Sequence, residues 1–205
     1  MDICKHTLGF ATVIALDNLL IPNVYELTYS FRVKTVDFEE QNVAFNRIKH
    51  FLEDRVNNSL VLSVHNSKYK TLAKLANPIV DLPCDPMDFP FACAIFKKLQ
   101  AITEGKFEVQ TLQMKSIVGD NVEYILTADD EDEMEMFLAD MPADRVWWDD
   151  NGPNINKTQP YITWEPVGLE WVEPKAKKDK SAKIARVIQF NPTIVEGGKS
   201  SWHLP

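Results

Sequence analysis

The chain has 205 residues, of which 45% are hydrophobic and 25% charged, and its formal net charge is −8. A chain of this length can bury its own core, and three cysteines are too few for a disulfide framework. The composition excludes collagen-like and disordered chains, and the acidic balance disfavours direct binding to nucleic acid. We find no apolar run of membrane-spanning length and no cleavable signal pattern, so we expect a cytoplasmic protein.

The first part of the chain favours two strands. Residues 9–21 are apolar and β-branched, although a turn at Asp17 could interrupt them, and Pro22 should end this strand. Residues 24–36 alternate between apolar and polar side chains, which is typical of a half-buried strand. The side chains expected to face the core are Leu27, Tyr29, Phe31 and Val33.

A long amphipathic helix should follow. Asp37 stands where an N-cap belongs, and apolar residues then recur at helical spacing as far as about Asn57. Residues 59–65 form a short apolar stretch, and 66–90 look irregular apart from a helical turn or two within 69–76.

A second helix and a hairpin come next. Asp88 and the proline two positions later start the helix, and Gly105 is placed to end it. Residues 107–114 and 121–127 are apolar and β-branched around a Gly-Asp-Asn turn, which predicts a β-hairpin.

The remaining sequence is acidic, rich in tryptophan and then rich in lysine. Residues 129–141 suit a short helix, and 142–174 carry four of the five tryptophans in an irregular segment that should be ordered. The run 175–183 reads as a flexible lysine-rich linker, and 184–195 as a late strand. The side chains of the short helix expected to face inward are Met134, Phe137, Leu138 and Met141.

These elements predict an α+β fold, in which an antiparallel sheet carries two helices on one face. We expect a domain over residues 1–128 and a C-terminal extension over 129–205, because composition and regularity change between them.

Three segments carry a resemblance to a known family. Val36-Asp37-Phe38 leads from strand to helix, the second helix is DFPFACAIFKKLQAI, and the hairpin pairs FEVQTLQM with NVEYILT. In this order the chain resembles the tunnelling fold (T-fold), in particular the 6-pyruvoyl- and 6-carboxytetrahydropterin synthases. The resemblance implies a homo-oligomer whose chains pair through their strands, with a purine- or pterin-like ligand at the subunit boundaries.

The chain also departs from that family. The synthases bind zinc through histidines on the first two strands, whereas here only His6 lies near the first strand and residues 24–36 contain none. The family's ring-anchoring glutamate is replaced by Thr111 or Gln113, which become the ligand-binding candidates, and its catalytic cysteine has no clear equivalent. We therefore expect a protein without metal or cofactor and favour a non-catalytic role. Metal-free catalysis and a zinc synthase with displaced ligands are the remaining alternatives.

Two further groups of residues have both a functional and a structural interpretation. His65 follows an apolar stretch and is the best candidate for acid–base chemistry, or else an ordinary histidine. Trp147 and Trp148, followed by Asp149 and Asp150, could clamp a partner, or they could pack the segment onto the sheet.

Two functions stay open. The first is a metal-free, oligomeric T-fold-like binding or assembly module. The second is an acidic interaction protein that mimics nucleic acid and blocks a basic, nucleic-acid-binding partner, because residues 128–150 hold ten acids and one arginine. Oligomeric state and salt dependence distinguish the two.

Overall fold

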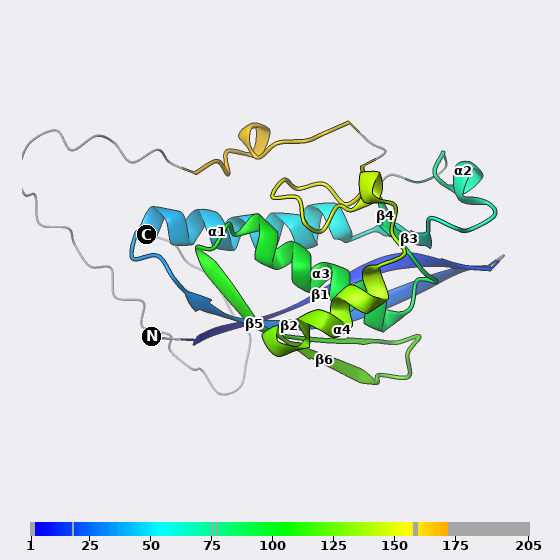
Figure 1. The fold of residues 1–205 in the computed structure, drawn as a ribbon, viewed down its shortest axis with the longest axis horizontal. Coiled ribbons are helices and arrows are strands. Elements are labelled where there is room, and N and C mark those ends of the chain that lie inside the picture. The colour runs from blue at the N-terminus through cyan, green and yellow to red at the C-terminus, as the bar shows by residue number, and fades with distance from the viewer. Residues whose placement is uncertain (1–2, 18, 75, 77, 158–159, 172–205) are drawn as a thin grey trace, which may run out of the picture. The chain divides into compact units, whose positions relative to one another are not determined.

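The structure, a computed structural model, describes residues 3–17, 19–74, 76, 78–157 and 160–171 (Figure 1). The chain divides into a compact unit of residues 1–172 and a second unit of 173–205, and all of the described residues belong to the first. The predicted linker 175–183 and strand 184–195 lie outside the described residues. The division at residue 128 stays a prediction.

One six-stranded sheet forms the centre of the fold, with strand order β4-β3-β1-β2-β5-β6. The pairs β1–β2, β2–β5 and β5–β6 are antiparallel, as expected, whereas β3 runs parallel to both β1 and β4. The strands are β1 (Ile3–Leu16), β2 (Leu19–Val33), β3 (Ser59–Ser63), β4 (Ile79–Leu82), β5 (Phe107–Ser116) and β6 (Glu123–Thr127).

The prediction of a purely antiparallel sheet was therefore wrong in one respect. Every residue of β3 and of β4 is buried, so neither strand has a solvent face. A strand buried on both faces shows no alternation of polar and apolar residues, which is the signal by which a strand is recognised. The α+β class and the predicted strand, strand, helix, helix, strand, strand order are otherwise confirmed.

The hairpin of β1 and β2 is longer than predicted. It turns at Asp17, which has a φ of +53°, and Pro22 lies inside β2 opposite Val13. The expectation that Pro22 ends the strand was wrong, because β5 pairs with β2 only from Tyr25 onward. No neighbouring strand therefore needs the N–H that Pro22 lacks.

The longer helices cover one face of the sheet, and one short helix packs on the other face. The helices are α1 (Phe38–His50), its π-helical continuation η1 (Phe51–Val56), α2 (Tyr69–Leu72), α3 (Asp88–Ile102) and α4 (Glu131–Leu138), and the short 3-10 turns are η2 (Ala128–Asp130), η3 (Ala143–Arg145) and η4 (Glu165–Val167). The predicted cap is confirmed, since Asp37 Oδ1 accepts hydrogen bonds from the Glu39 and Glu40 N–H groups at 2.8 and 3.3 Å. Helices α1 and α3 cross the same side of the sheet (Figure 1).

The core lies between this layer and the sheet. Leu27, Tyr29 and Phe31 of β2 are buried there, as the period-two pattern predicts, and Val33 at the end of the strand is only partly buried against the same core. In α4, Met134 and Leu138 face inward, and Met141 just beyond the helix is also buried. Phe137 was expected inward but is exposed, because it lies at the edge of the helix stripe, where its ring packs against that of Phe89.

The tryptophan-rich segment closes one edge of the sheet. Trp147 Nε1 donates a hydrogen bond to the Asp81 carbonyl at 2.8 Å, and Asn156 Nδ2 donates one to the Ile79 carbonyl at 2.7 Å. These two carbonyls belong to the outer strand β4, which would otherwise present unpaired backbone groups. The segment thus takes the place of a seventh strand and blocks further strand pairing at this edge.

Two buried cations hold the same segment to the helices. Lys98 of α3 donates from Nζ to the carbonyls of Trp147 and Asp150, at 2.8 and 2.6 Å. Arg47 of α1 donates to the Leu169 carbonyl at 2.8 Å, and its guanidinium lies 4.0 Å from the centroid of the Trp171 ring. Both side chains are almost fully buried, so each is a structural anchor rather than a surface charge.

Candidate functional site

The face of the sheet opposite the helices is open over strands β1, β2, β5 and β6. Among the described residues, no helix or loop packs over this face, whereas α2 packs against the same side of β3 and β4. We call it the open sheet surface. Its side chains are Lys5, Thr7, Gly9, Val24, Glu26, Thr28, Ser30, Thr111, Gln113, Lys115, Glu123 and Ile125.

Polar side chains on this surface pair across the strands in consecutive rows. Thr7 and Thr28 share a hydrogen bond of 2.8 Å between their hydroxyl oxygens. One row further along, Ser30 and Thr111 share one of 2.7 Å. Such cross-strand pairs fix the register of a sheet and hold its outer face rigid. The open sheet surface is therefore an ordered polar platform.

The two predicted ligand-binding residues both lie on this platform. The Thr111 hydroxyl is already occupied by Ser30, and Gln113 lies opposite Thr28 in the next row. They share a face, as their spacing of two residues along a strand requires.

A groove of about 450 Å³ crosses the platform beside the turn between β5 and β6. Gly9 lies in its floor, where the missing side chain leaves room between Thr7 and the Glu26–Lys115 ion pair. The ion-pair distance is 3.0 Å. Neither Gly9 nor the ion pair was predicted from the sequence, because only the register of three strands brings them into one row.

Exposed apolar side chains border the groove. Val24 lies in its wall and Ile117 at its end, where the Ile117 N–H donates to the Val24 carbonyl at 3.1 Å. Other large apolar side chains exposed around this end of the sheet are Leu20, Val118, Val122 and Ile125. Exposed apolar side chains that gather on one face often mark an interaction surface.

Two backbone edges beside the platform are also open. Strand β3 pairs with β1 only at residues 12–15, and Asn57 and Asn58 bind the backbone of Ala11. Within the described residues, no strand pairs with the outer side of β1 over residues 3–9, nor with the outer side of β6. These edges could each accept a strand from another chain.

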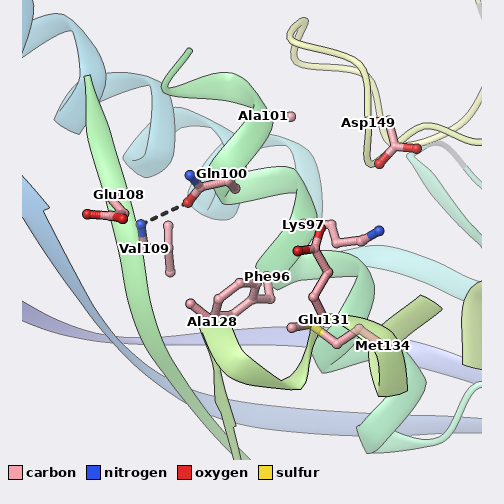
Figure 2. A pocket seen from close by; sticks show the side chains of 10 residues that line it. All are labelled: Phe96, Lys97, Gln100, Ala101, Glu108, Val109, Ala128, Glu131, Met134 and Asp149. Carbon is pink, nitrogen blue, oxygen red and sulfur yellow. Dashed lines mark hydrogen bonds between the residues drawn. The ribbon is translucent and has the colours of Figure 1, made fainter. Parts of the chain in front are cut away.

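A second cavity, of about 380 Å³, lies on the helix side of the sheet (Figure 2). We call it the α3 pocket. Its wall on β5 is shaped by a β-bulge. Ser30 pairs with Thr111 and Phe31 pairs with Val109, so Gln110 has no partner residue on β2. The N–H of Val109 donates to Gln100 Oε1 at 2.8 Å, so a side chain of α3 fixes the bulge (Figure 2).

The other predicted site residues do not converge with these features. His65 lines a separate polar pocket of about 200 Å³ with Asp17 and Asp85, so its acid–base role stays a prediction. Trp147 and Trp148 are buried within the chain, which supports packing rather than a partner clamp. Asp149 reaches the rim of the α3 pocket instead (Figure 2), and Asp150 is paired with Lys157 at 3.2 Å.

The residues present do not fit a zinc site of the synthase kind. His6 packs against the rings of Tyr29 and Phe45, on the helix-facing side of the sheet. In the part of the chain that the structure describes, no three His, Cys, Asp or Glu side chains lie close enough together to hold a metal ion. We therefore derive no chemistry through a metal.

A buried polar cluster that the sequence did not reveal lies below the groove, at the start of α3. Ser116 Oγ donates to Asp88 Oδ2 at 2.6 Å. The Tyr25 hydroxyl lies beside Asp88 and Asn23 without a well-formed hydrogen bond to either, and burial followed by the Asp88 charge raises the pKa of Tyr25. A pKa raised in this way keeps the phenol neutral, so Tyr25 is not a nucleophile.

The fold and these surfaces define an α+β protein with one mixed sheet, two main helices on one face and an open polar platform on the other. Comparison with solved structures matches it to an uncharacterized protein from Wolinella succinogenes, with a TM-score of 0.47 and 9% identity over 62% of this chain and 98% of that one. It also matches a catalytic-residue mutant of Plasmodium vivax 6-pyruvoyltetrahydropterin synthase, with a TM-score of 0.34 and the same identity and coverage.

Comparisons at the level of sequence found no relative. No family model matches the chain, and no curated protein matches it significantly. Among the helices that the structure describes, none is long and apolar enough to cross a membrane.

Proposed function

We propose that the chain is a homo-oligomeric binding module whose copies associate through the open sheet surface and its edges. The observation that carries the proposal is the combination of open backbone edges on β1 and β6 with exposed apolar side chains beside them. An isolated chain that left both exposed would be prone to uncontrolled edge pairing. Association in a closed ring would satisfy the backbone groups and cover the apolar side chains.

The closed edge at β4 restricts how copies can add. Trp147 and Asn156 already occupy the outer carbonyls of β4, so among the described residues the edge at β6 and the free part of β1 are left for a second chain to pair with. These are two different surfaces of one chain, and contacts between different surfaces generate rings when the rotation closes. The expected assembly is therefore a symmetric ring with the polar platforms facing inward.

The groove is the ligand site in this proposal. A flat heteroaromatic ring of the purine or pterin kind would lie over Gly9 and meet the polar groups of Glu26, Lys115 and Asn121. The groove is open in one copy, and a neighbouring copy would supply its missing wall. The role is binding rather than synthase catalysis, because the chain lacks the histidines that such a zinc site needs.

Native mass spectrometry tests the proposal, because it reports oligomer size and retained ligand together. The wild type should appear as one symmetric oligomer. Val24→Lys should yield a folded monomer. The charged side chain would be buried in the interface of the oligomer, whereas in the free chain it is exposed and the stability of the fold is unchanged. Val36→Lys is the matched control, since Val36 is fully exposed and lies away from the open sheet surface, and this variant should stay oligomeric. A monomeric wild type would overturn the proposal.

A second function is favoured by one observation, the acidic face of α4. Asp132, Glu133 and other carboxylates of this helix are exposed, and of the acids on α4 only Glu135 has an ion pair among the described residues, with Lys97 at 3.2 Å. Such a surface would attract a basic, nucleic-acid-binding protein. This alternative predicts a monomer that binds a basic partner with steep salt dependence, whereas ring assembly should persist at high salt.

A further inference from the structure

The α3 pocket combines an apolar floor with an acidic rim. Its floor is formed by Phe96 and Met134, both nearly buried, together with Val109 of the bulged wall. Figure 2 shows the side chains of Phe96 and Met134 on adjacent sides of the cavity, with Gln100 and Val109 closing it on the β5 side. A volume of about 380 Å³ is in the range of small-molecule sites.

The charges around the rim do not balance. Glu108 is paired with Lys34 at 2.7 Å, and Lys97 is paired with Glu135 at 3.2 Å, so these two residues are neutralised within the chain. Glu131 and Asp149 line the same cavity from α4 and from the tryptophan-rich segment, and neither has an ion pair within the described residues. The pocket therefore presents two unpaired carboxylates above an apolar floor.

The walls of the pocket are held in place by hydrogen bonds within the chain. The bulge at Gln110 is held by Gln100, and Lys98 anchors the segment that carries Asp149 by bonding the two carbonyls on either side of it. The Thr127 side chain caps the turn that positions Glu131. The two carboxylates thus come from different elements that are each tied down locally, which is how binding sites are preorganised.

We propose that the α3 pocket binds a small organic cation, namely an amine carried on a flat apolar body. The apolar body lies on Phe96 and Met134, and the ammonium group lies between Glu131 and Asp149. An anion would meet uncompensated like charge, and a neutral molecule of the same shape would leave both carboxylates without a partner. This site is separate from the groove on the open sheet surface, and it does not depend on oligomer formation.

A titration with three isosteric probes tests the ligand class. Phenethylamine, phenethyl alcohol and hydrocinnamate are added to the full chain, and amide shifts are followed by nuclear magnetic resonance. The amine should shift residues of α3, α4 and the start of β5, and it should bind more tightly than the alcohol, while the acid should not bind. Equal binding of amine and alcohol, shifts elsewhere in the chain, or no binding of the amine would each overturn the proposal.

Two variants test the location. Glu131→Gln combined with Asp149→Asn should weaken amine binding about tenfold. Each variant removes one exposed ion pair to the ammonium group, and the two losses of affinity multiply. The matched control is Glu133→Gln. Glu133 is an exposed acid of α4 that does not line the cavity, so the affinity of this variant for the amine should be unchanged. Ala101→Leu should fill the cavity and abolish binding. If the double variant binds like the wild type, or the control weakens binding equally, the carboxylates are not the recognition groups.

Discussion

Replacing Lys98 by methionine should change the stability of the protein in a way that depends on pH. Lys98 is fully buried, and burial lowers the pKa of its ammonium group to about 7, although the nearby Asp150 charge acts in the opposite direction. An unfolded lysine titrates near 10.4, so the unfolded chain binds more protons than the folded chain between these two values. Stability supplied by this group must therefore rise with pH over that window.

The size of the effect follows from the same linkage. With a folded pKa near 7, the wild type should gain about 2 kcal/mol between pH 7 and pH 9 relative to the Lys98→Met variant. Below pH 7 the difference should be flat, because the lysine is charged in both states. The neutral amine keeps two N–H donors, which suffice for the carbonyls of Trp147 and Asp150. The variant leaves both carbonyls unpaired at every pH, at a cost of about 1–3 kcal/mol for each.

Urea unfolding of both proteins at about one-unit steps between the two pKa values and just below them measures this difference. The contributions of the other titrating groups to the free energy of unfolding are the same in both proteins and cancel. Lys97→Met is the matched control, since Lys97 is the neighbouring residue of α3 but is partly exposed and, among the described residues, forms its ion pair with Glu135. Its effect should stay below about 1 kcal/mol at each pH. A Lys98→Met difference that is constant from pH 7 to pH 9 would show that the lysine is not desolvated and that the burial argument is wrong.

Three further substitutions probe other parts of the fold. Phe31→Asp should unfold or disassemble the protein because it buries a carboxylate, whereas Arg32→Asp on the opposite face should fold, and equal melting temperatures would refute the register. Gly119→Ala should lower the melting temperature, because its new Cβ would clash with Asp88 Oδ2, and an unchanged value would contradict this contact. Arg47→Met should shift tryptophan fluorescence to longer wavelength by freeing the rings it contacts; an unshifted spectrum would mean that they stay packed.

The parts of the fold that could be predicted are the elements that have one buried face and one face exposed to water. The alternation of Leu27, Tyr29 and Phe31 with polar residues predicted both β2 and its buried face. Asp37 could be recognised as a cap because its side chain acts on N–H groups two and three residues away. Signals of this kind are local in the sequence, so one chain is enough to find them.

The parts that could not be predicted depend on contacts between distant segments. Strands β3 and β4 carry no alternation, and the burial of Lys98 and Arg47 could not be anticipated because both residue types normally face water. For the site, the sequence offered Thr111 or Gln113 as ligand-binding candidates, and the structure shows that both lie on the open sheet surface, while their role stays a prediction. The groove needed the register of three strands, and the α3 pocket needed a bulge that changes that register.

The bulge at Gln110 also determines how β5 can change in length. The inward residues are Phe107 and Val109 before it, and Leu112 and Met114 after it, so the inward positions pass from odd to even numbers across the bulge. Deleting Gln110 would join the two halves into one uninterrupted alternation, with every core side chain still facing the core. Deleting Gln113 would instead turn the end of the strand inside out, because Met114 would then face away from the core. Within β5, a residue can thus be lost at Gln110 or at Thr111 without reversing the two faces of the strand, at the expense of the pocket wall that the bulge creates.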